Sequence, residues 1–217
     1  MRYILVSILF FNLSLFAQTK SSLQNMSIVT KKARFYHLVV PVVHKVYKEL
    51  QTQYVETLKD INSSKNSDKI KKLKKEYGVA TDKELLVALK PHPQSIALAQ
   101  AAMESAWATS KFFIRANNIF GIWSTNKNEP RVAANQKRDG NKTIWLKKFH
   151  TLEDSVRFYY KTIAKHRAYK EFRKVRYSTN DVMKMIKKLD KYSETGRGYT
   201  KKLGGLIRYN KLTKYDK

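Results

Sequence analysis

Helical patterns dominate this 217-residue chain, and only one stretch has a different pattern. Apolar residues recur at three- and four-residue spacing from Pro41 to about Ile61, and an alanine-rich helical pattern runs from Gln94 to about Phe113. Residues 131–149 instead contain β-branched and aromatic residues around a plausible Asp139-Gly140 turn. We therefore expect a mainly α fold with one small β-hairpin.

Capping patterns mark where further helices should begin. Thr81 with Glu84, and Thr151 with Asp154, place a hydroxyl and a carboxylate three residues apart, as at helix N-termini. Other short helices are expected at about 68–78, 168–176, 180–190 and 199–209. We expect a loose start over residues 18–34 and a loop from Tyr192 to Gly198.

The first 17 residues have the pattern of an export signal. Arg2 precedes an apolar run from Ile4 to Phe16, and Ala17 is an acceptable cleavage position. The run is shorter than the roughly 20 residues that a membrane-spanning helix needs. Residues 1–17 are therefore predicted to be a signal peptide, and the protein periplasmic or extracellular; an uncleaved anchor or a buried helix is the alternative.

The remaining chain divides into a basic, mostly helical N-terminal extension, residues 18–75, and a larger domain, residues 76–217. The sequence leaves open whether the extension is a separate targeting element or part of the core. With no cysteine, the chain has neither disulfides nor thiolate metal sites. None of its five histidines pairs at the i, i+4 spacing of a zinc site, so no metal and no other cofactor is expected.

Charge indicates the kind of partner. The 44 basic and 17 acidic residues give a formal net charge of +27, which attracts polyanions. Nucleic acid would be the first expectation inside a cell, whereas an exported protein meets anionic cell-envelope polymers. We therefore expect envelope polymers and no nucleic acid as partners. The lysine run from Lys65 to Lys75 is also typical of a solvated helix face.

Glu104 is the carboxyl with the most distinctive surroundings. It is the only acid between Glu84 and Glu129, and small or apolar residues surround it on the expected helix. Partial desolvation would raise its pKa and keep its proton near neutral pH, as a general acid requires. An exposed glutamate on an amphipathic helix is the alternative.

Two further motifs change the balance between these alternatives. Residues 99–107 (AQAAMESAW) and residues 117–123 (NNIFGIW) resemble the glucosaminidase family of peptidoglycan hydrolases, glycoside hydrolase family 73. They look most like its Bax-type branch, and the resemblance covers about residues 75–212. It implies a lysozyme-like helical fold with a small β-lobe and cleavage after N-acetylglucosamine in peptidoglycan glycan strands. It also puts the catalytic acid at Glu104.

A second group usually stabilises positive charge at the sugar carbon. The carboxyl candidates are Asp139 and Glu129 near the predicted hairpin, and Glu194 in a Tyr-Ser-Glu motif that the family places beside the acid. Alternatively, the substrate's own acetamido oxygen attacks while Tyr192 holds it. The sequence does not choose among these.

Sugar-binding candidates are the aromatic residues around these motifs, because aromatic rings suit the apolar faces of sugars. They are Phe120, Trp123, Tyr192 and Tyr199. Core packing is an equal possibility for Phe120, and a turn role is an equal possibility for Asn118, the last substrate-binding candidate. We expect a monomeric endo-β-N-acetylglucosaminidase; a lytic transglycosylase and a non-catalytic wall-glycan-binding protein are the alternatives.

Overall fold

A computed structural model describes residues 23, 25–138 and 142–216. The expected signal peptide and the Asp139-Gly140 turn lie outside these residues. The helices are α2 (Ile28–Asn62), α3 (Ser67–Tyr77), α4 (Asp82–Leu89), α5 (Gln94–Glu104), α6 (Lys111–Ala116), α7 (Leu152–Lys165), α8 (Lys170–Ser178), α9 (Val182–Ile186) and α10 (Arg197–Tyr209). The strands are β1 (Arg131–Arg138) and β2 (Lys142–Lys147), and short 3₁₀ turns η2 (Arg167–Tyr169), η3 (Asp190–Tyr192) and η4 (Leu212–Tyr215) complete the fold.

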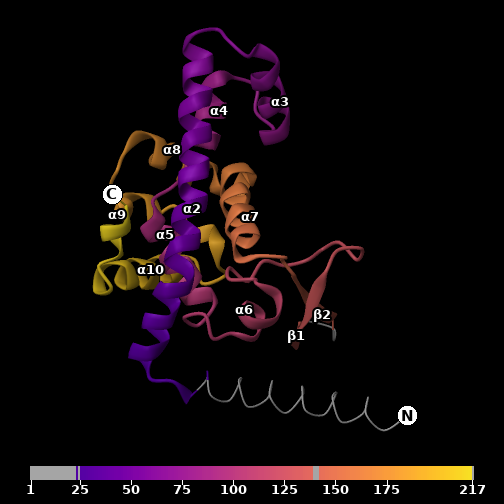
Figure 1. Ribbon diagram of the computed structural model, residues 1–217, viewed down its shortest axis with the longest axis vertical. Coiled ribbons are helices and arrows are strands. Elements are labelled where there is room, and N and C mark those ends of the chain that lie inside the picture. Colours follow the sequence, from indigo (N-terminus) through magenta and orange to yellow (C-terminus); the bar gives the residue numbers. More distant parts are fainter. Residues whose placement is uncertain (1–22, 24, 139–141, 217) are drawn as a thin grey trace, which may run out of the picture.

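Helix α2 runs along the whole body of the protein (Figure 1). It begins at Ile28, where the Ser27 hydroxyl accepts a hydrogen bond from the Thr30 backbone N–H at 3.1 Å. The expected loose start over residues 18–34 is therefore wrong from residue 28 onward. Pro41 lies inside the helix instead of opening it, although proline removes one helical hydrogen bond.

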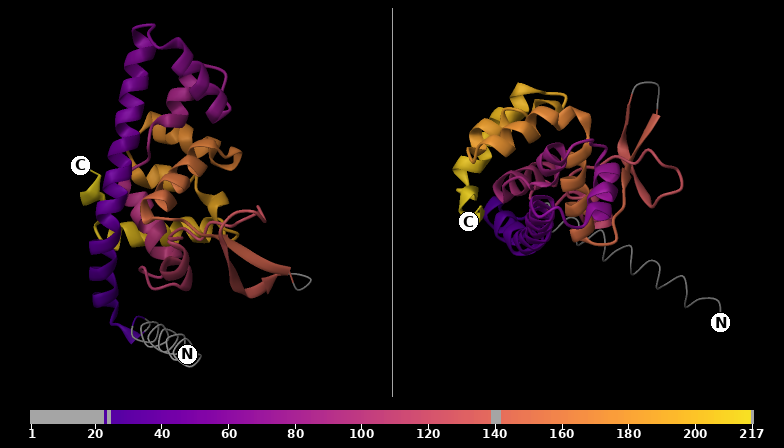
Figure 2. Two further views of the ribbon diagram at one scale, coloured as in Figure 1. Left: turned by 45° about the vertical axis from the view of Figure 1, so that its right-hand side comes forward. Right: turned by 90° about the horizontal axis from the view of Figure 1, so that it is seen from above.

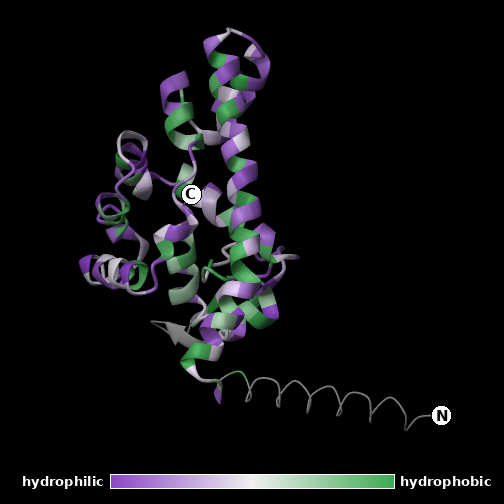
Figure 3. Ribbon diagram, turned by 60° about the vertical axis from the view of Figure 1, so that its left-hand side comes forward, coloured by the Kyte–Doolittle hydropathy of each residue, from purple (hydrophilic) through white to green (hydrophobic). Residues whose placement is uncertain are grey.

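The proline is tolerated because α2 has a strongly buried face. Phe35, Val39 and Val43 are spaced four residues apart and are at most 1% exposed. Hydrophobic and hydrophilic residues alternate along the helix, as its solvated outer side requires (Figure 3). The burial of this stripe offsets the lost hydrogen bond.

The first half of α2 shares one hydrophobic core with the larger domain. This core includes Phe35 and Val46 from α2, Ile96 and Leu98 from α5, and Leu203 from α10. The question that the sequence left open is thereby answered for this half of α2, which is part of the core. The other end of α2 packs with α3 and α4 around a smaller cluster (Figure 2).

Helix α5 lies at the centre of the larger core, and every residue from Gln94 to Ala102 is buried. Its alanines let α2 and α10 approach closely from two sides. The predicted continuous helix over residues 94–113 is wrong between Glu104, where α5 ends, and Lys111, where α6 begins. Between these helices, Ala106, Trp107 and Ala108 all have the positive φ angles of a left-handed turn, at 50°, 59° and 63°.

Contacts from two directions hold this left-handed turn. The Ser105 hydroxyl donates to the Ala101 carbonyl at 2.6 Å and accepts from the Ala108 N–H at 2.8 Å. The Arg34 guanidinium of α2 donates to the Ala108 carbonyl at 2.7 Å. Trp107 consequently leaves the α5 axis and packs edge-on against Phe35, 5.3 Å between ring centroids, so it belongs to the core.

The other predicted helices and strands are confirmed within the described residues. Strands β1 and β2 pair antiparallel, with Val132 opposite Leu146, and project from one end of the helical body (Figure 1). Both capping boxes form, and Asp154 acts as the capping partner of Thr151. The short helices lie within a few residues of their expected ends. Among the described residues, no helix is long and apolar enough to cross a membrane.

The packing of α2 leads to a stability prediction. Phe35→Ala should lower the free energy of unfolding by about 3–5 kcal/mol, because it leaves a cavity where α2 meets α5. Val29→Ala is the matched control on the same helix, since Val29 is 74% exposed. Urea unfolding measures both. Equal effects of the two substitutions would mean that α2 is not part of the core.

Candidate active site

A cavity of about 600 Å³ lies where α5, α7 and the loops after α6 and η3 meet. Its walls come from segments that are far apart in the sequence. They are Glu104, Phe120, Gly121, Ile122, Trp123, Thr162, Tyr169, Tyr192, Ser193, Glu194 and Thr195. The fold therefore brings Glu104 together with four other predicted site residues: Phe120, Trp123, Tyr192 and Glu194.

Glu104 is the last residue of α5, and its carboxyl reaches this cavity. Burial raises the pKa of the carboxyl, and a hydrogen bond donated by the Tyr199 hydroxyl partly opposes that rise. The net effect is a raised pKa, so the carboxyl keeps its proton to higher pH than an exposed glutamate does. Such a group can donate a proton to a bound ligand.

Gly121 lies directly opposite this carboxyl. Its φ of +64° is in the left-handed region, and a Cβ atom there would be 3.8 Å from Glu104 Oε2. Glycine thus provides the backbone turn and leaves space beside the acid for a ligand.

Asn118 shapes the loop that carries Gly121. Its side-chain oxygen accepts from the Ile122 N–H, and its amide nitrogen donates to the carbonyls of Ile122 and Lys147, each at 2.8 Å. The side chain is 1% exposed and does not line the cavity. These hydrogen bonds are those of a turn residue, whereas substrate binding by Asn118 stays a prediction.

The aromatic candidates differ in exposure. Phe120 is 3% exposed and stacks on Tyr159 with 3.9 Å between ring centroids, so most of its surface serves core packing. Trp123 is 55% exposed and lines the cavity.

Two stacked tyrosines stand next to the acid. The rings of Tyr192 and Tyr199 are 5.4 Å apart, and the Tyr192 hydroxyl donates to the Phe120 carbonyl at 3.5 Å. Burial raises the pKa of both phenols, so both keep their protons. Tyr199 contacts the carboxyl of Glu104 through its hydroxyl. Because it is 4% exposed and does not line the cavity, its ring is poorly placed to stack on a sugar.

The three carboxyl candidates for a second group are separated by position. Glu194 lines the same cavity as Glu104. Glu129 forms an ion pair with Lys147, which lowers the pKa of the carboxyl, and it does not line the cavity. Asp139 lies outside the described residues.

Several lining residues were not among the sequence candidates. Gly121 lies within the motif at residues 117–123, whose resemblance could have identified it, and Tyr169 belongs to the short turn η2. Thr162 had no such signal, because it is a single polar residue within the helical pattern of α7. Ile122, Ser193 and Thr195 are neighbours of predicted residues and enter the cavity with their loops.

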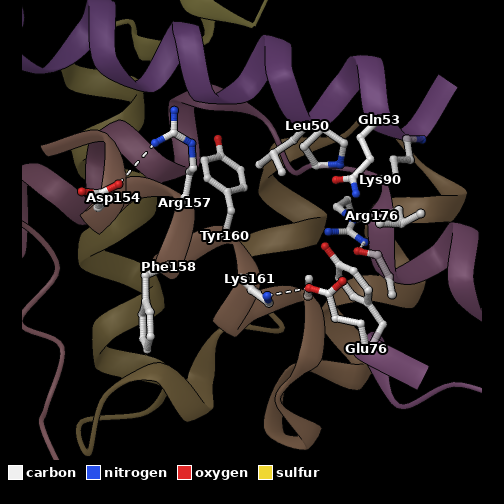
Figure 4. Close-up of a pocket in the computed structure, with 15 residues that line it drawn as sticks. Leu50, Gln53, Glu76, Lys90, Asp154, Arg157, Phe158, Tyr160, Lys161 and Arg176 are labelled. Atoms are coloured by element: carbon white, nitrogen blue, oxygen red, sulfur yellow. Dashed lines mark hydrogen bonds and ion pairs between the residues drawn. The ribbon is translucent and has the colours of Figure 1, made fainter. Parts of the chain in front are cut away.

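A second cavity, of about 380 Å³, lies between α2, α4 and α7 (Figure 4). Its acids are ion-paired: Glu76 with Lys161 at 2.6 Å, and Asp154 with Arg157 at 3.4 Å. Buried Arg176 donates to the Val87 and Ala88 carbonyls at the end of α4. Because these carboxylates are neutralised, we assign the acid chemistry to the cavity at Glu104. No three His, Asp or Glu side chains gather as a metal site in the described part of the chain.

The helical fold with one hairpin, and a desolvated carboxyl facing a cavity, define a lysozyme-like glycosidase scaffold. Residues 84–212 match the glucosaminidase family, described as mannosyl-glycoprotein endo-β-N-acetylglucosaminidase. The match spans more than half of the chain, and the protein therefore belongs to the glucosaminidase family. It is a glycoside hydrolase of the endo-β-N-acetylglucosaminidase type.

Solved structures with a similar fold agree with the predicted architecture. The catalytic domain of the autolysin Auto from Listeria monocytogenes is 18% identical, covers 93% of this chain and 97% of its own, and has a TM-score of 0.55. An N-acetylmuramoyl-L-alanine amidase from Staphylococcus aureus is 17% identical over 87% of this chain and 44% of its own, with a TM-score of 0.56. No curated protein matches the chain.

The position of Gly121 leads to a prediction with a matched control. Gly121→Ala should lower glycan hydrolysis, because the methyl group, in van der Waals contact with Glu104 Oε2, would occupy the space beside the acid that a ligand needs. Gly78→Ala has nearly the same φ, +66°, but its methyl group would meet nothing within 4 Å. Each should lower the free energy of unfolding by about 1–2 kcal/mol from left-handed strain. Hydrolysis assays with urea unfolding test this, and equal activity losses would contradict the steric explanation.

Proposed function

We propose that this protein cleaves the glycan strands of peptidoglycan as an endo-β-N-acetylglucosaminidase, with Glu104 as general acid. The observation that carries the proposal is the burial-raised pKa of a carboxyl that faces a cavity with exposed aromatic surface. The family match supports the bond class, and the autolysin fold supports peptidoglycan as the polymer.

In the proposed reaction, Glu104 gives its proton to the glycosidic oxygen of the leaving sugar. Trp123 contacts the apolar face of a sugar ring at the exposed side of the cavity. Gly121 leaves the space in which the scissile bond can approach the acid.

Glu194 is our proposed second group, because it lines the same cavity as Glu104 whereas Glu129 does not. Its carboxylate would stabilise positive charge at the sugar carbon or activate water. The route through the substrate's acetamido oxygen, held by Tyr192, is the alternative, and it predicts that Glu194→Gln retains turnover.

The wider setting is also a proposal. The signal-like residues 1–17 support export, and the net charge of +27 supports attraction to anionic cell-envelope polymers rather than a role on nucleic acid. The motifs at residues 99–107 and 117–123 support placement in the Bax-type branch. We propose that the protein acts as a monomer.

The first test of this function is Glu104→Gln. Turnover of purified sacculi should fall at least about 100-fold while the fold and sacculus binding persist, since the amide cannot donate the required proton. Glu153→Gln on the surface of α7 is the control and should keep full activity. Retained activity in Glu104→Gln would show that Glu104 is not the general acid.

Mass spectrometry of the digest separates the rival functions. Reducing N-acetylglucosamine ends support the hydrolase, and 1,6-anhydromuramic ends would establish a lytic transglycosylase. Sacculi that remain uncleaved would indicate a binding protein.

The pH dependence provides a second test. Because the acid must be protonated, kcat/KM should fall as pH rises through the raised pKa of Glu104. If Glu194 acts as a carboxylate, activity should also fall at low pH, and Glu194→Gln should lose the low-pH fall along with most turnover. A pH profile without a high-pH fall would contradict the role of Glu104.

A further inference from the structure

A continuous chain of buried hydrogen bonds runs from His92 to the proposed catalytic acid. His92 Nε2 and the Tyr159 hydroxyl are 2.9 Å apart, and that hydroxyl donates to Gln100 Oε1. Gln100 Nε2 donates to the Tyr199 hydroxyl oxygen at 2.8 Å, and Tyr199 in turn donates to Glu104. The four residues behind the acid are at most 4% exposed, so solvent does not compete for these bonds.

The amide of Gln100 sets the direction of donation along this hydrogen-bond chain. An amide has an oxygen that only accepts and a nitrogen that only donates. Since the oxygen faces Tyr159 and the nitrogen faces Tyr199, the Tyr199 oxygen is an acceptor toward Gln100. The single hydroxyl proton of Tyr199 is therefore directed at Glu104.

The His92 end of the hydrogen-bond chain donates in the same direction. Tyr159 uses its proton on Gln100, so His92 must donate from Nε2, and burial keeps the imidazole neutral by lowering its pKa. His92 Nδ1 is buried and has no hydrogen-bond partner. A reversed chain would put the imidazole proton on Nδ1, and a buried N–H without an acceptor is rare in folded proteins because it is costly.

We propose that Gln100 is a positioning residue, which holds the Tyr199 hydroxyl as a donor toward Glu104 and thereby stabilises the carboxylate that forms as the acid gives up its proton. This inference rests on the proposed role of Glu104. It extends that role because a donor fixed before the reaction and aimed at developing charge lowers the barrier to proton transfer. Tyr159 and His92 act through Gln100 by fixing which end of its amide faces Tyr199.

Few other groups near Glu104 can titrate. Tyr169, Tyr192 and Glu194 line the same cavity, and burial raises the pKa of both tyrosines. Glu194 is the other carboxyl among the described residues that line this cavity. Every variant below keeps Glu194, so a change in the titration of Glu104 reports on the hydrogen-bond chain.

The test compares Gln100→Met and Tyr159→Phe with Tyr160→Phe. Tyr160 is a matched control, because its ring stacks on His92 at 4.3 Å and its buried hydroxyl donates to the His92 carbonyl at 3.4 Å, off the chain. The full-length protein is labelled with ¹³C at glutamate carboxyls, and Glu104 is identified by its absence in Glu104→Gln. The titration of that carboxyl is followed beside the pH profile of turnover.

In Gln100→Met, the titration of Glu104 and the high-pH fall of activity should both move up, by at most about one pH unit, because the Tyr199 hydroxyl loses the donor that orients it toward Glu104. Turnover kcat should fall about tenfold with KM unchanged, since the change acts on proton transfer and not on binding. Tyr159→Phe should move the titration of Glu104 and the high-pH fall of activity in the same direction, by a smaller amount. Tyr160→Phe should leave the titration of Glu104 and the pH profile of activity unchanged.

An unchanged titration in Gln100→Met and Tyr159→Phe would overturn the inference, as would an equal shift in Tyr160→Phe. If Gln100→Met does not fold, Tyr159→Phe decides, because it keeps the ring that stacks on Phe120. Activity in Glu104→Gln would remove the proposed acid, whereas the carboxyl titration still tests the chain. The two failures are therefore distinguishable.

Discussion

The site depends on one unfavourable placement, a carboxyl at the carboxyl-terminal end of a buried helix. Glu104 ends α5, and the last turn of that helix contains no basic residue. The helix dipole and burial both disfavour a negative charge there, and the Tyr199 hydroxyl opposes them only in part. The rest of the site follows from this placement, because the surrounding loops leave space in front of the carboxyl while a buried hydrogen-bond chain supports it from behind.

The backbone leaves the α5 axis immediately after that carboxyl, and this turn costs free energy. Three successive residues that are not glycine adopt left-handed angles, and each costs about 1–2 kcal/mol. The Ser105 hydroxyl, the Arg34 guanidinium and the packing of Trp107 against Phe35 offset the strain. Helix α2 therefore supports the site indirectly, since Arg34 and Phe35 hold the turn that ends α5 at the acid.

Part of the site could be predicted from the sequence and part could not. Glu104, Trp123, Tyr192 and Glu194 were predicted because each lies in or beside a short motif, and all four line the cavity together with Phe120. The orientations of Asn118 and Tyr199 were not predictable, since both are set by partners distant in the chain. Asn118 turned inward to the backbone, and Tyr199 turned its hydroxyl to the acid instead of its ring to the cavity.

The sequence by itself determined the features that depend on neighbouring residues. These are the capping boxes at Thr81 and Thr151, the hairpin strands and the alanine-rich character of α5. Tertiary structure alone decided that α2 continues through Pro41 and that α5 stops at Glu104. The first outcome depends on the buried stripe of α2, and the second on the contact between Arg34 of α2 and the turn after α5, 74 residues apart in the chain. Local periodicity cannot report such a contact, because its free energy comes from surfaces that meet only in the folded protein.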